Sequence, residues 1–220
     1  MSSPVRDGAA RLYAAVAFGP AAAVYAFLVD QPAWREDCRA LGALVPGPRV
    51  LDLGIGPGTG AVEMARAAPG TRHVGLDRSA SMLRRAARAA GAGAVTLPLV
   101  RGDALRLPVR DGALDGATGH SVLYLLPDPA AALAELHRAL RPGGRVAFLE
   151  PRRQGAPLAA TLAGGPRFAA AMLLWRGMSR LHRRYDEAEL ASLLSRAGFA
   201  GARAWPVLGG HGVMATAERA

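Results

Sequence analysis

Short apolar runs alternate with longer amphipathic stretches through the middle of the chain. Five of these runs have the length of buried strands, and helical patterns separate most of them. The predicted strands are Val50–Leu53, His73–Leu76, Thr96–Val100, Ala113–Thr118 and Arg145–Leu149, and the predicted helices are Gly60–Ala68, Ser79–Ala90 and Pro129–Leu140. Strands that alternate with helices through short connections predict a parallel sheet with helices on both faces.

The C-terminal part of the chain predicts a helix followed by a hairpin. A helical pattern over Asp186–Ala197 ends at Gly198, and two further strand candidates, Ala202–Val207 and Val213–Ala217, follow it. A glycine-rich turn separates these two strands, so one of them should run antiparallel to the rest of the sheet. The sequence therefore predicts an α/β fold with one reversed strand.

Two further segments lie outside this alternation. The longest apolar run, residues 14–29, is interrupted by Gly19-Pro20 and is short for a transmembrane helix. We interpret it as a pair of short helices broken at Gly19-Pro20, with a signal peptide as the alternative. The composition of Gln154–Pro166 is that of an insertion or a mobile loop.

A basic amphipathic pattern occupies Phe168–Tyr185. If this segment is helical, four apolar side chains form one stripe and four arginines fall on the opposite side. The stripe consists of Leu174, Met178, Leu181 and Tyr185, and the arginines are Arg176, Arg180, Arg183 and Arg184. Such a helix can lie on an anionic membrane surface, or it can pack as a lid with its arginines in water.

The 220 residues are enough for one domain with a sizeable core, since 51% of them are hydrophobic. We therefore expect a single domain, 1–220, in four parts. These are an N-terminal helical cover (1–48), a cofactor-binding core (49–151), a lid or insertion (152–184), and a C-terminal helix with a hairpin (185–220).

Charge and cysteine content change this picture only slightly. The formal net charge is +10, and all 27 basic side chains are arginine. In a chain so rich in Ala, Gly and Pro, this indicates a genome-wide composition bias, with a basic surface for anionic lipid or an acidic partner as the alternative. The single cysteine, Cys38, can form no internal disulfide and has no cluster of metal ligands around it. We therefore expect a cytoplasmic protein without a metal site.

The candidate chemistry begins in the turn that follows the first predicted strand. Gly54, Gly56 and Gly58 have no Cβ, so the backbone can take positive φ and touch a ligand. The next helix points its N-terminus at the same place. Together with Ala61 and Asp77, this turn also satisfies the dinucleotide-binding pattern, so an NAD(P)-dependent oxidoreductase is one interpretation.

Three acids decide between a phosphate and a cationic ligand. Asp52, Asp77 and Asp103 come from three successive strands and should meet at one edge of the sheet. A carboxylate about 4 Å from a pyrophosphate would be repelled by about 4 kcal/mol at an intermediate dielectric. S-adenosylmethionine fits better, because it carries a cationic ammonium and sulfonium, a ribose diol and an adenine amino group, but no phosphate.

The ordered motifs resemble the class I S-adenosylmethionine-dependent methyltransferases. These motifs are Asp52-Leu-Gly-Ile-Gly-Pro-Gly-Thr-Gly60, Val74-Gly-Leu-Asp77, Gly102-Asp-Ala-Leu-Arg-Leu-Pro108 and Leu140-Arg-Pro-Gly-Gly144. The resemblance implies a Rossmann-like, doubly wound sheet of seven mostly parallel strands with an antiparallel last strand and a helical cover. It also implies S-adenosyl-L-methionine as the cofactor and S-adenosyl-L-homocysteine as the product.

The same resemblance assigns the site. The implied cofactor-binding residues are Asp52, Gly54, Gly56, Gly58, Asp77, Arg78, Asp103, Ala104, His120 and Ser121. The first acid and the glycines would hold the methionyl end, the second acid the ribose, and the third acid with the following amide the adenine. His120 is also the candidate catalytic residue, either as a base or as a donor that orients the acceptor. A hydrogen-bonded loop histidine is the alternative.

Within this class, the layout is most similar to the ubiquinone and menaquinone C-methyltransferases and the phospholipid N-methyltransferases. The shared features are Trp34-Arg35, Pro127-Asp128-Pro129, Leu136-His-Arg-Ala-Leu-Arg-Pro-Gly-Gly144 and Tyr185-Asp-Glu with Ala197-Gly-Phe199. These framework motifs do not fix the acceptor. We expect a small, apolar or lipid-like molecule that is methylated at carbon, nitrogen or oxygen, and peripheral contact with the inner face of an anionic membrane.

Nucleic acid is not an expected partner. The Asn/Asp-Pro-Pro-aromatic run of methyltransferases that modify nucleic acid bases is absent after the fourth strand, and interleaved aromatics and lysines are lacking. A protein that binds the cofactor without catalysis remains an alternative, and the sequence does not indicate the oligomeric state.

Overall fold

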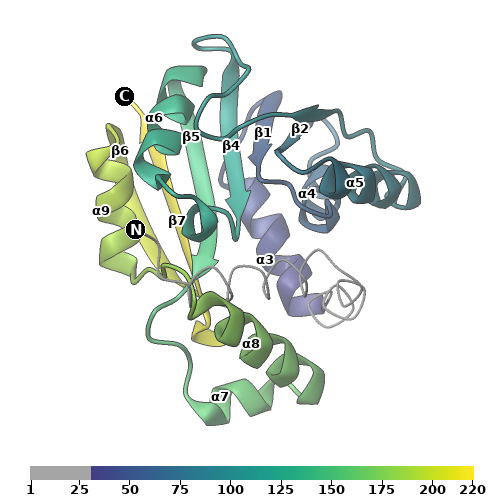
Figure 1. Cartoon of the computed structure of the whole chain (residues 1–220), viewed down its shortest axis with the longest axis vertical. Helices are drawn as coiled ribbons and strands as arrows, with labels where there is room; N and C mark the ends of the chain where they lie inside the picture. Colours follow the sequence, from purple (N-terminus) through teal and green to yellow (C-terminus); the bar gives the residue numbers. More distant parts are fainter. Residues whose placement is uncertain (1–30) are drawn as a thin grey trace.

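The computed structural model describes residues 31–220, which form one seven-stranded sheet with helices on both faces (Figure 1). The strands are β1 (Arg49–Leu53), β2 (Arg72–Asp77), β3 (Leu99–Arg101), β4 (Leu114–His120), β5 (Leu140–Pro151), β6 (Phe199–Val207) and β7 (Gly212–Arg219). Their order across the sheet is β3-β2-β1-β4-β5-β7-β6. The pairs from β3 to β5 are parallel, and β7 is antiparallel to both of its neighbours. The predicted Rossmann-like α/β sheet with one reversed strand is therefore confirmed.

Two hydrophobic cores sandwich the sheet. The helices are α3 (Pro32–Ala43), α4 (Thr59–Ala67), α5 (Ala80–Gly93), α6 (Pro129–Ala139), α7 (Leu158–Ala163), α8 (Pro166–Ser179) and α9 (Glu187–Arg196), with short 3₁₀ turns η1 (Leu123–Leu125) and η2 (Leu208–Gly210). One core lies under α6 and α9, and the other under α3, α4, α5 and α8. Along β5, Val146 and Phe148 enter the first core while Ala147 and Leu149 enter the second, because successive strand residues point to opposite faces.

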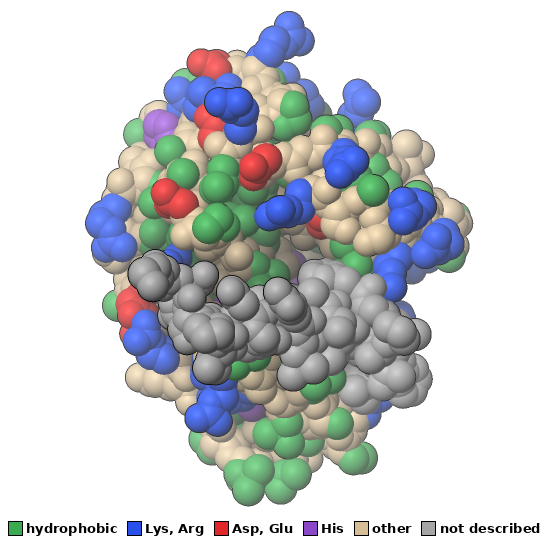
Figure 2. Space-filling model, viewed as in Figure 1, with side chains coloured by type: hydrophobic (Ala, Val, Ile, Leu, Met, Phe, Trp, Pro, Cys, Tyr) green, Lys and Arg blue, Asp and Glu red, His purple; other side chains and the backbone are tan. Residues whose placement is uncertain are grey.

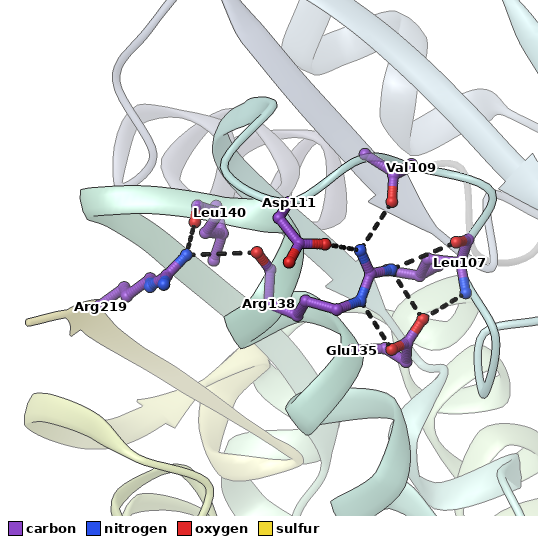
Figure 3. A network of polar contacts seen from close by, with 7 residues as sticks. All are labelled: Leu107, Val109, Asp111, Glu135, Arg138, Leu140 and Arg219. Atoms are coloured by element: carbon purple, nitrogen blue, oxygen red, sulfur yellow. Dashed lines mark hydrogen bonds and ion pairs between the residues drawn. The ribbon is translucent and has the colours of Figure 1, made fainter.

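The first core is closed at one edge by an arginine clamp on α6 (Figure 3). Arg138 donates to both carboxylate oxygens of Glu135 at 2.9 Å and to the carbonyl of Val109 at 2.9 Å. It also pairs with Asp111 at 2.5 Å, and Glu135 in turn accepts from the N–H of Leu107 at 2.8 Å. These contacts fix the loop before β4 onto α6 and hold the pKa of Arg138 above its ordinary value. The clamp thereby sets where β4 begins.

Several predicted boundaries need correction. β3 covers Leu99–Arg101 instead of Thr96–Val100, because only these three residues pair with β2. β5 begins at Leu140, where the chain leaves α6, and not at Arg145. The predicted loose stretch Gln154–Pro166 contains the helix α7.

The predicted helix over Phe168–Tyr185 is wrong in its extent. α8 ends at Ser179, so Leu181 and Tyr185 do not continue its stripe. The buried residues of α8 include Phe168, Ala171, Met172 and Trp175, which belong to the second core. Of the predicted stripe, Met178 is buried on α8, whereas Leu174 is only partly buried.

The predicted pair of N-terminal helices broken at Gly19-Pro20, and its signal-peptide alternative, lie outside the described residues. Between residues 31 and 220, none of the helices combines the length and the apolar character that crossing a bilayer requires.

Candidate functional site

The glycine turn lies at the carboxyl edge of the sheet, between β1 and α4. Gly54, Gly56 and Gly58 all adopt positive φ, at 65°, 56° and 82°. A Cβ on Gly58 would stand 2.8 Å from the Cα of Ala86 on α5, and one on Gly54 would stand 2.5 Å from the side chain of Val122. The turn can therefore hold its shape only with glycine, and it presents bare backbone toward the space above the sheet.

Asp77 ties this turn to the end of β2. One oxygen of its carboxylate accepts from the N–H of Gly56 at 3.0 Å, and the other accepts from the N–H of Ser79 at 2.8 Å. The carboxylate is half-buried, and the neighbouring Arg78 is exposed. The structure thus brings Asp77 and the glycine turn into direct contact at the predicted site.

Asp52 lies beneath the turn, almost fully buried in β1. It accepts a hydrogen bond from the hydroxyl of Thr118 on β4 at 3.0 Å. Burial raises its pKa to about 7, the hydrogen bond from Thr118 opposes this shift, and the charge of Asp77 adds to it. Among residues 31–220 no cationic side chain pairs with Asp52. A buried acid without a cation favours a positively charged ligand.

Asp103 and Ala104 follow β3 at the same edge. The N–H of Gly102 donates to the carbonyl of Asp77 at 3.1 Å, which places Asp103 directly beyond the ribose-binding candidate. The Asp103 carboxylate is exposed and accepts from the N–H of Leu105 at 3.0 Å, whereas Ala104 is buried. These two residues therefore form the outer end of the candidate site.

His120 ends β4 and is held by Trp34 of α3. The indole Nε1–H of Trp34 donates to Nε2 of His120 at 3.0 Å, and the two rings meet edge to face with their centres 5.6 Å apart. Burial lowers the pKa of His120 to about 4, although a hydrogen bond to its own backbone opposes this shift. The ring is therefore neutral at pH 7, with its proton on Nδ1. It can take up a proton only after Trp34 moves away.

Ser121 occupies a strained position next to His120. Its φ is +56°, which is uncommon for a residue with a Cβ, and its N–H donates to the carbonyl of Leu149 at 2.7 Å. Its hydroxyl is buried and has no hydrogen-bond partner among the described residues. A buried hydroxyl without a partner is a docking point for a polar ligand group. This orphaned group and the bare glycine turn are both what a bound S-adenosylmethionine needs.

Glu150 is a residue that the sequence analysis missed. It is fully buried at the end of β5, and its carboxylate accepts from the N–H groups of Val122, Leu123 and Tyr124 at 3.0, 2.8 and 3.2 Å. Burial raises its pKa to about 7 against the effect of these three bonds. An acid that directly follows an apolar strand is a signal that could have identified it.

Two further polar side chains line the region between β5 and the α7–α8 segment. Tyr185 is buried, and burial raises its pKa to about 12 although a hydrogen bond with Arg183 opposes this shift. His211 lies within 2.8 Å of the hydroxyl of Thr161 on α7. In the described part of the chain, His, Cys, Asp and Glu side chains form no group of three or more that could hold a metal ion.

Comparison with known proteins connects this geometry to a family. A family model described as a methyltransferase domain matches residues 51–148. A demethylmenaquinone methyltransferase of Mycolicibacterium paratuberculosis is 34% identical over 197 residues, which cover 84% of this chain and 82% of that protein. An uncharacterised transposon protein of Streptomyces fradiae is 45% identical over 110 residues, which cover 48% of this chain and 31% of that protein.

The fold has close counterparts among solved structures. The structure of an S-adenosylmethionine-dependent methyltransferase from Aquifex aeolicus superposes with a TM-score of 0.65 at 18% identity and covers 98% of both chains. At this level of identity the likeness concerns the fold alone.

Proposed function

The chain belongs to the class I S-adenosylmethionine-dependent methyltransferases, and from this premise we propose that it methylates a quinone-type ring at carbon. The observation that carries the proposal is the similarity to a demethylmenaquinone methyltransferase over most of both chains. The indole of Trp34, which meets the ring of His120 edge to face, supports an apolar acceptor. Phospholipid or small-molecule N- or O-methylation is the alternative within the same chemistry.

The cofactor would be held by the residues that meet at the carboxyl edge of the sheet. We propose that Asp52 and the glycine turn bind the methionyl end, and that Asp77 binds the ribose hydroxyls. Asp103 and the Ala104 amide would take the adenine, with Arg78 beside the ribose. Ser121 would use its unpartnered hydroxyl on the same ligand. When bound, S-adenosylmethionine supplies a methyl group on a positively charged sulfur that is already activated for displacement.

The protein's own part in the reaction is alignment and exclusion of water. Glu150 holds three successive N–H groups of the turn after β4, so it fixes the position of the residues that border the acceptor. His120 would orient the acceptor through Nδ1–H only after that N–H leaves the residue's own backbone, because Trp34 occupies Nε2. A role of His120 as a base requires that Trp34 first release the ring, which a bound acceptor could bring about by displacing the indole.

The two rival functions make different demands on the site. A nicotinamide-dependent oxidoreductase would place a pyrophosphate over the glycine turn, directly above a buried acid that lacks a cationic partner. That arrangement is electrostatically unfavourable. A non-catalytic binding protein would need the cofactor pocket but not the ordered acceptor side around His120 and Glu150.

The acceptor class also bears on where the protein works. A lipid-like quinone partitions into a bilayer, so we propose a cytoplasmic enzyme with peripheral contact to the inner face of the membrane. Contact of this kind needs a surface that combines apolar and basic side chains.

Two measurements test the proposal. Calorimetric titration with S-adenosylhomocysteine and with NADH distinguishes the cofactors, and preferential binding of NADH would exclude a methyltransferase. Incubation with S-adenosylmethionine and a set of acceptors then identifies the product by its added CH₂ mass. The set contains a demethylated naphthoquinol, a phospholipid amine and a catechol. We expect the naphthoquinol to be methylated, and methylation of another acceptor alone would refute the quinone assignment while keeping the enzyme class.

A further inference from the structure

We propose that the α7–α8 segment, residues 158–184, is a surface that docks on a bilayer of anionic phospholipid. The inference deepens the proposed function, because it rests on a lipid-like acceptor for its purpose, although its structural basis is independent of the reaction. The surface combines exposed leucines with a group of arginines that form no ion pair with a carboxylate of residues 31–220.

The apolar part of this surface is unusual for the molecule. Among the described residues, the large hydrophobic side chains with the greatest exposure are Leu158, Leu162, Leu173 and Leu181, at 66%, 58%, 57% and 41%. All four lie on α7, on α8 or directly after α8. Figure 2 shows hydrophobic side chains gathered at the lower end of the molecule, where Figure 1 places α7. A group of leucines exposed to water is energetically unfavourable, so it indicates a binding surface.

The basic part of the surface includes one of these leucines, Leu173. Arg176, Arg180 and Arg184 line a groove of about 380 Å³ together with Leu173 and Gly177. In the part of the chain that the structure describes, no carboxylate forms an ion pair with any of the three arginines. Partial burial lowers the pKa of Arg184, and the charges of Arg176, Arg180 and Arg153 lower it further. The groove therefore has an excess of positive charge.

A bilayer with anionic headgroups is complementary to both the exposed leucines and the arginines. Leucine side chains can enter the boundary between headgroups and acyl chains, and the arginines can contact phosphates at the level above it. A second copy of the chain would cover the leucines but would bring one arginine group against another. An acidic protein would neutralise the arginines but would leave leucines in water unless it also presented an apolar face.

The same segment is connected to the candidate active site. The inner face of α8 packs in the core that contains Leu149 of β5, and His211 links α7 to the turn before β7. After α8, the N–H of Tyr185 donates to the carbonyl of Pro151 at 3.1 Å, next to the buried Glu150. Docking would therefore place the acceptor side of the site against the lipid surface.

The test is flotation of the full-length protein with vesicles, without cofactor or acceptor. One set of vesicles contains phosphatidylglycerol and phosphatidylcholine in equal parts, and the other contains phosphatidylcholine alone. We expect binding to the anionic vesicles, and weaker binding as salt concentration rises. Equal partition onto both kinds of vesicle would overturn the proposal, as would a dimer in sedimentation analysis that does not bind vesicles.

Variants locate the surface. Arg180→Gln/Arg184→Gln should lower the vesicle partition coefficient by about twenty-five-fold, since each basic residue near an anionic surface contributes about fivefold. Leu158→Ser/Leu162→Ser should also lower it, by about fivefold or more, through loss of apolar contact. Arg84→Gln/Arg88→Gln is the matched control, because these are also exposed arginines four positions apart, on α5. A loss in the control equal to that in Arg180→Gln/Arg184→Gln would refute a localised surface.

The outcome is separable from that of the proposed function. Affinity for S-adenosylhomocysteine, measured on every variant, verifies that each one folds. Methylation of the naphthoquinol without vesicle binding would overturn the docking surface and keep the enzyme. Vesicle binding without methylation of any acceptor would keep the docking surface and overturn the proposed methylation.

Discussion

Buried acids at the two edges of the sheet have different partners, and their pKa values are shifted in opposite directions. At the amino edge, Asp115 at the start of β4 receives Arg49 at 2.9 Å and Arg141 at 2.7 Å, and the hydrogen bonds from Arg49 are the main cause that lowers its pKa to about 2. At the carboxyl edge, Asp52 and Glu150 are buried as deeply, but burial raises the pKa of each to about 7. Arginine is abundant in this chain, yet no arginine between residues 31 and 220 forms an ion pair with either of these two acids.

We propose that this difference separates an acid that stabilises the fold, Asp115, from an acid of the cofactor site, Asp52. An acid with two arginines stabilises the fold and has no capacity left for a ligand. An ionised acid that is buried without a cation lowers the stability of the fold. A bound cationic ligand stabilises that charge.

The largest expected effect is on cofactor affinity. Asp77→Ala removes the carboxylate proposed to bind the ribose and also releases the N–H of Gly56. We expect S-adenosylhomocysteine to bind about a hundredfold more weakly, since two charge-assisted hydrogen bonds are lost. Calorimetric titration measures this. Asp115→Ala at the other edge should change the affinity by no more than about twofold, because it does not contact the proposed site. An equal loss in both variants would contradict the division between the two edges.

A pair of glycine substitutions compares the backbone at the two edges. Gly58→Ala forces a Cβ against the backbone of Ala86 at positive φ, so it should destabilise the fold by about 2 to 3 kcal/mol. Gly112→Ala in the turn before β4 has a similar φ of +64° but nothing within 4 Å of the new Cβ. It should cost about 1 kcal/mol, from backbone strain alone. Urea unfolding measures both, and equal losses would show that crowding at the glycine turn is unimportant.

The pH dependence of cofactor binding tests Asp52. In the free protein its pKa is raised to about 7, so below pH 7 it is mostly protonated and must lose a proton to face the cofactor's ammonium. Affinity for S-adenosylhomocysteine should therefore fall by about tenfold between pH 8 and pH 6. Asp52→Asn should remove most of this dependence, which separates Asp52 from Glu150. A wild-type affinity that stays flat over this range would refute the proposed role.

The smallest effect is on acid stability at the amino edge. The pKa of Asp115 is lowered in the folded state to about 2, so its contribution is present above the unfolded value near 3.8 and disappears as pH falls through about 2. Asp115→Asn should cost about 1 kcal/mol at pH 7, because both arginines are half exposed and water screens the pairs. Unfolding curves of the variant and the wild type should converge near pH 2. A constant difference down to that pH would indicate a packing defect instead.

Local patterns were sufficient for the parts of the site that lie close together in sequence. The apolar run before three alternating glycines predicted a strand, a turn at positive φ and a helix in that order, and the structure has β1, the turn and α4 there. Asp77 and Asp103 were predicted at the carboxyl edge because parallel strands with helical crossovers must end at the same edge. The spacing of apolar residues along the chain differs between strands and helices. It can therefore be recognised from neighbouring residues without knowing which elements pack together.

The sheet, its reversed strand and the edge where the acids gather could be predicted from the residues alone, since they follow from local periodicity, turn residues and the handedness of crossovers. The hydrogen bond from Trp34 to Nε2 of His120, a residue 86 positions away, and the ordering of the turn after β4 by Glu150 could not be predicted in this way. The protonation of Asp52, Asp115 and Glu150 was likewise decided by burial and by the arginines that the fold brings near or keeps away. Desolvation and long-range hydrogen bonds depend on which surfaces meet in space, and no local pattern records that.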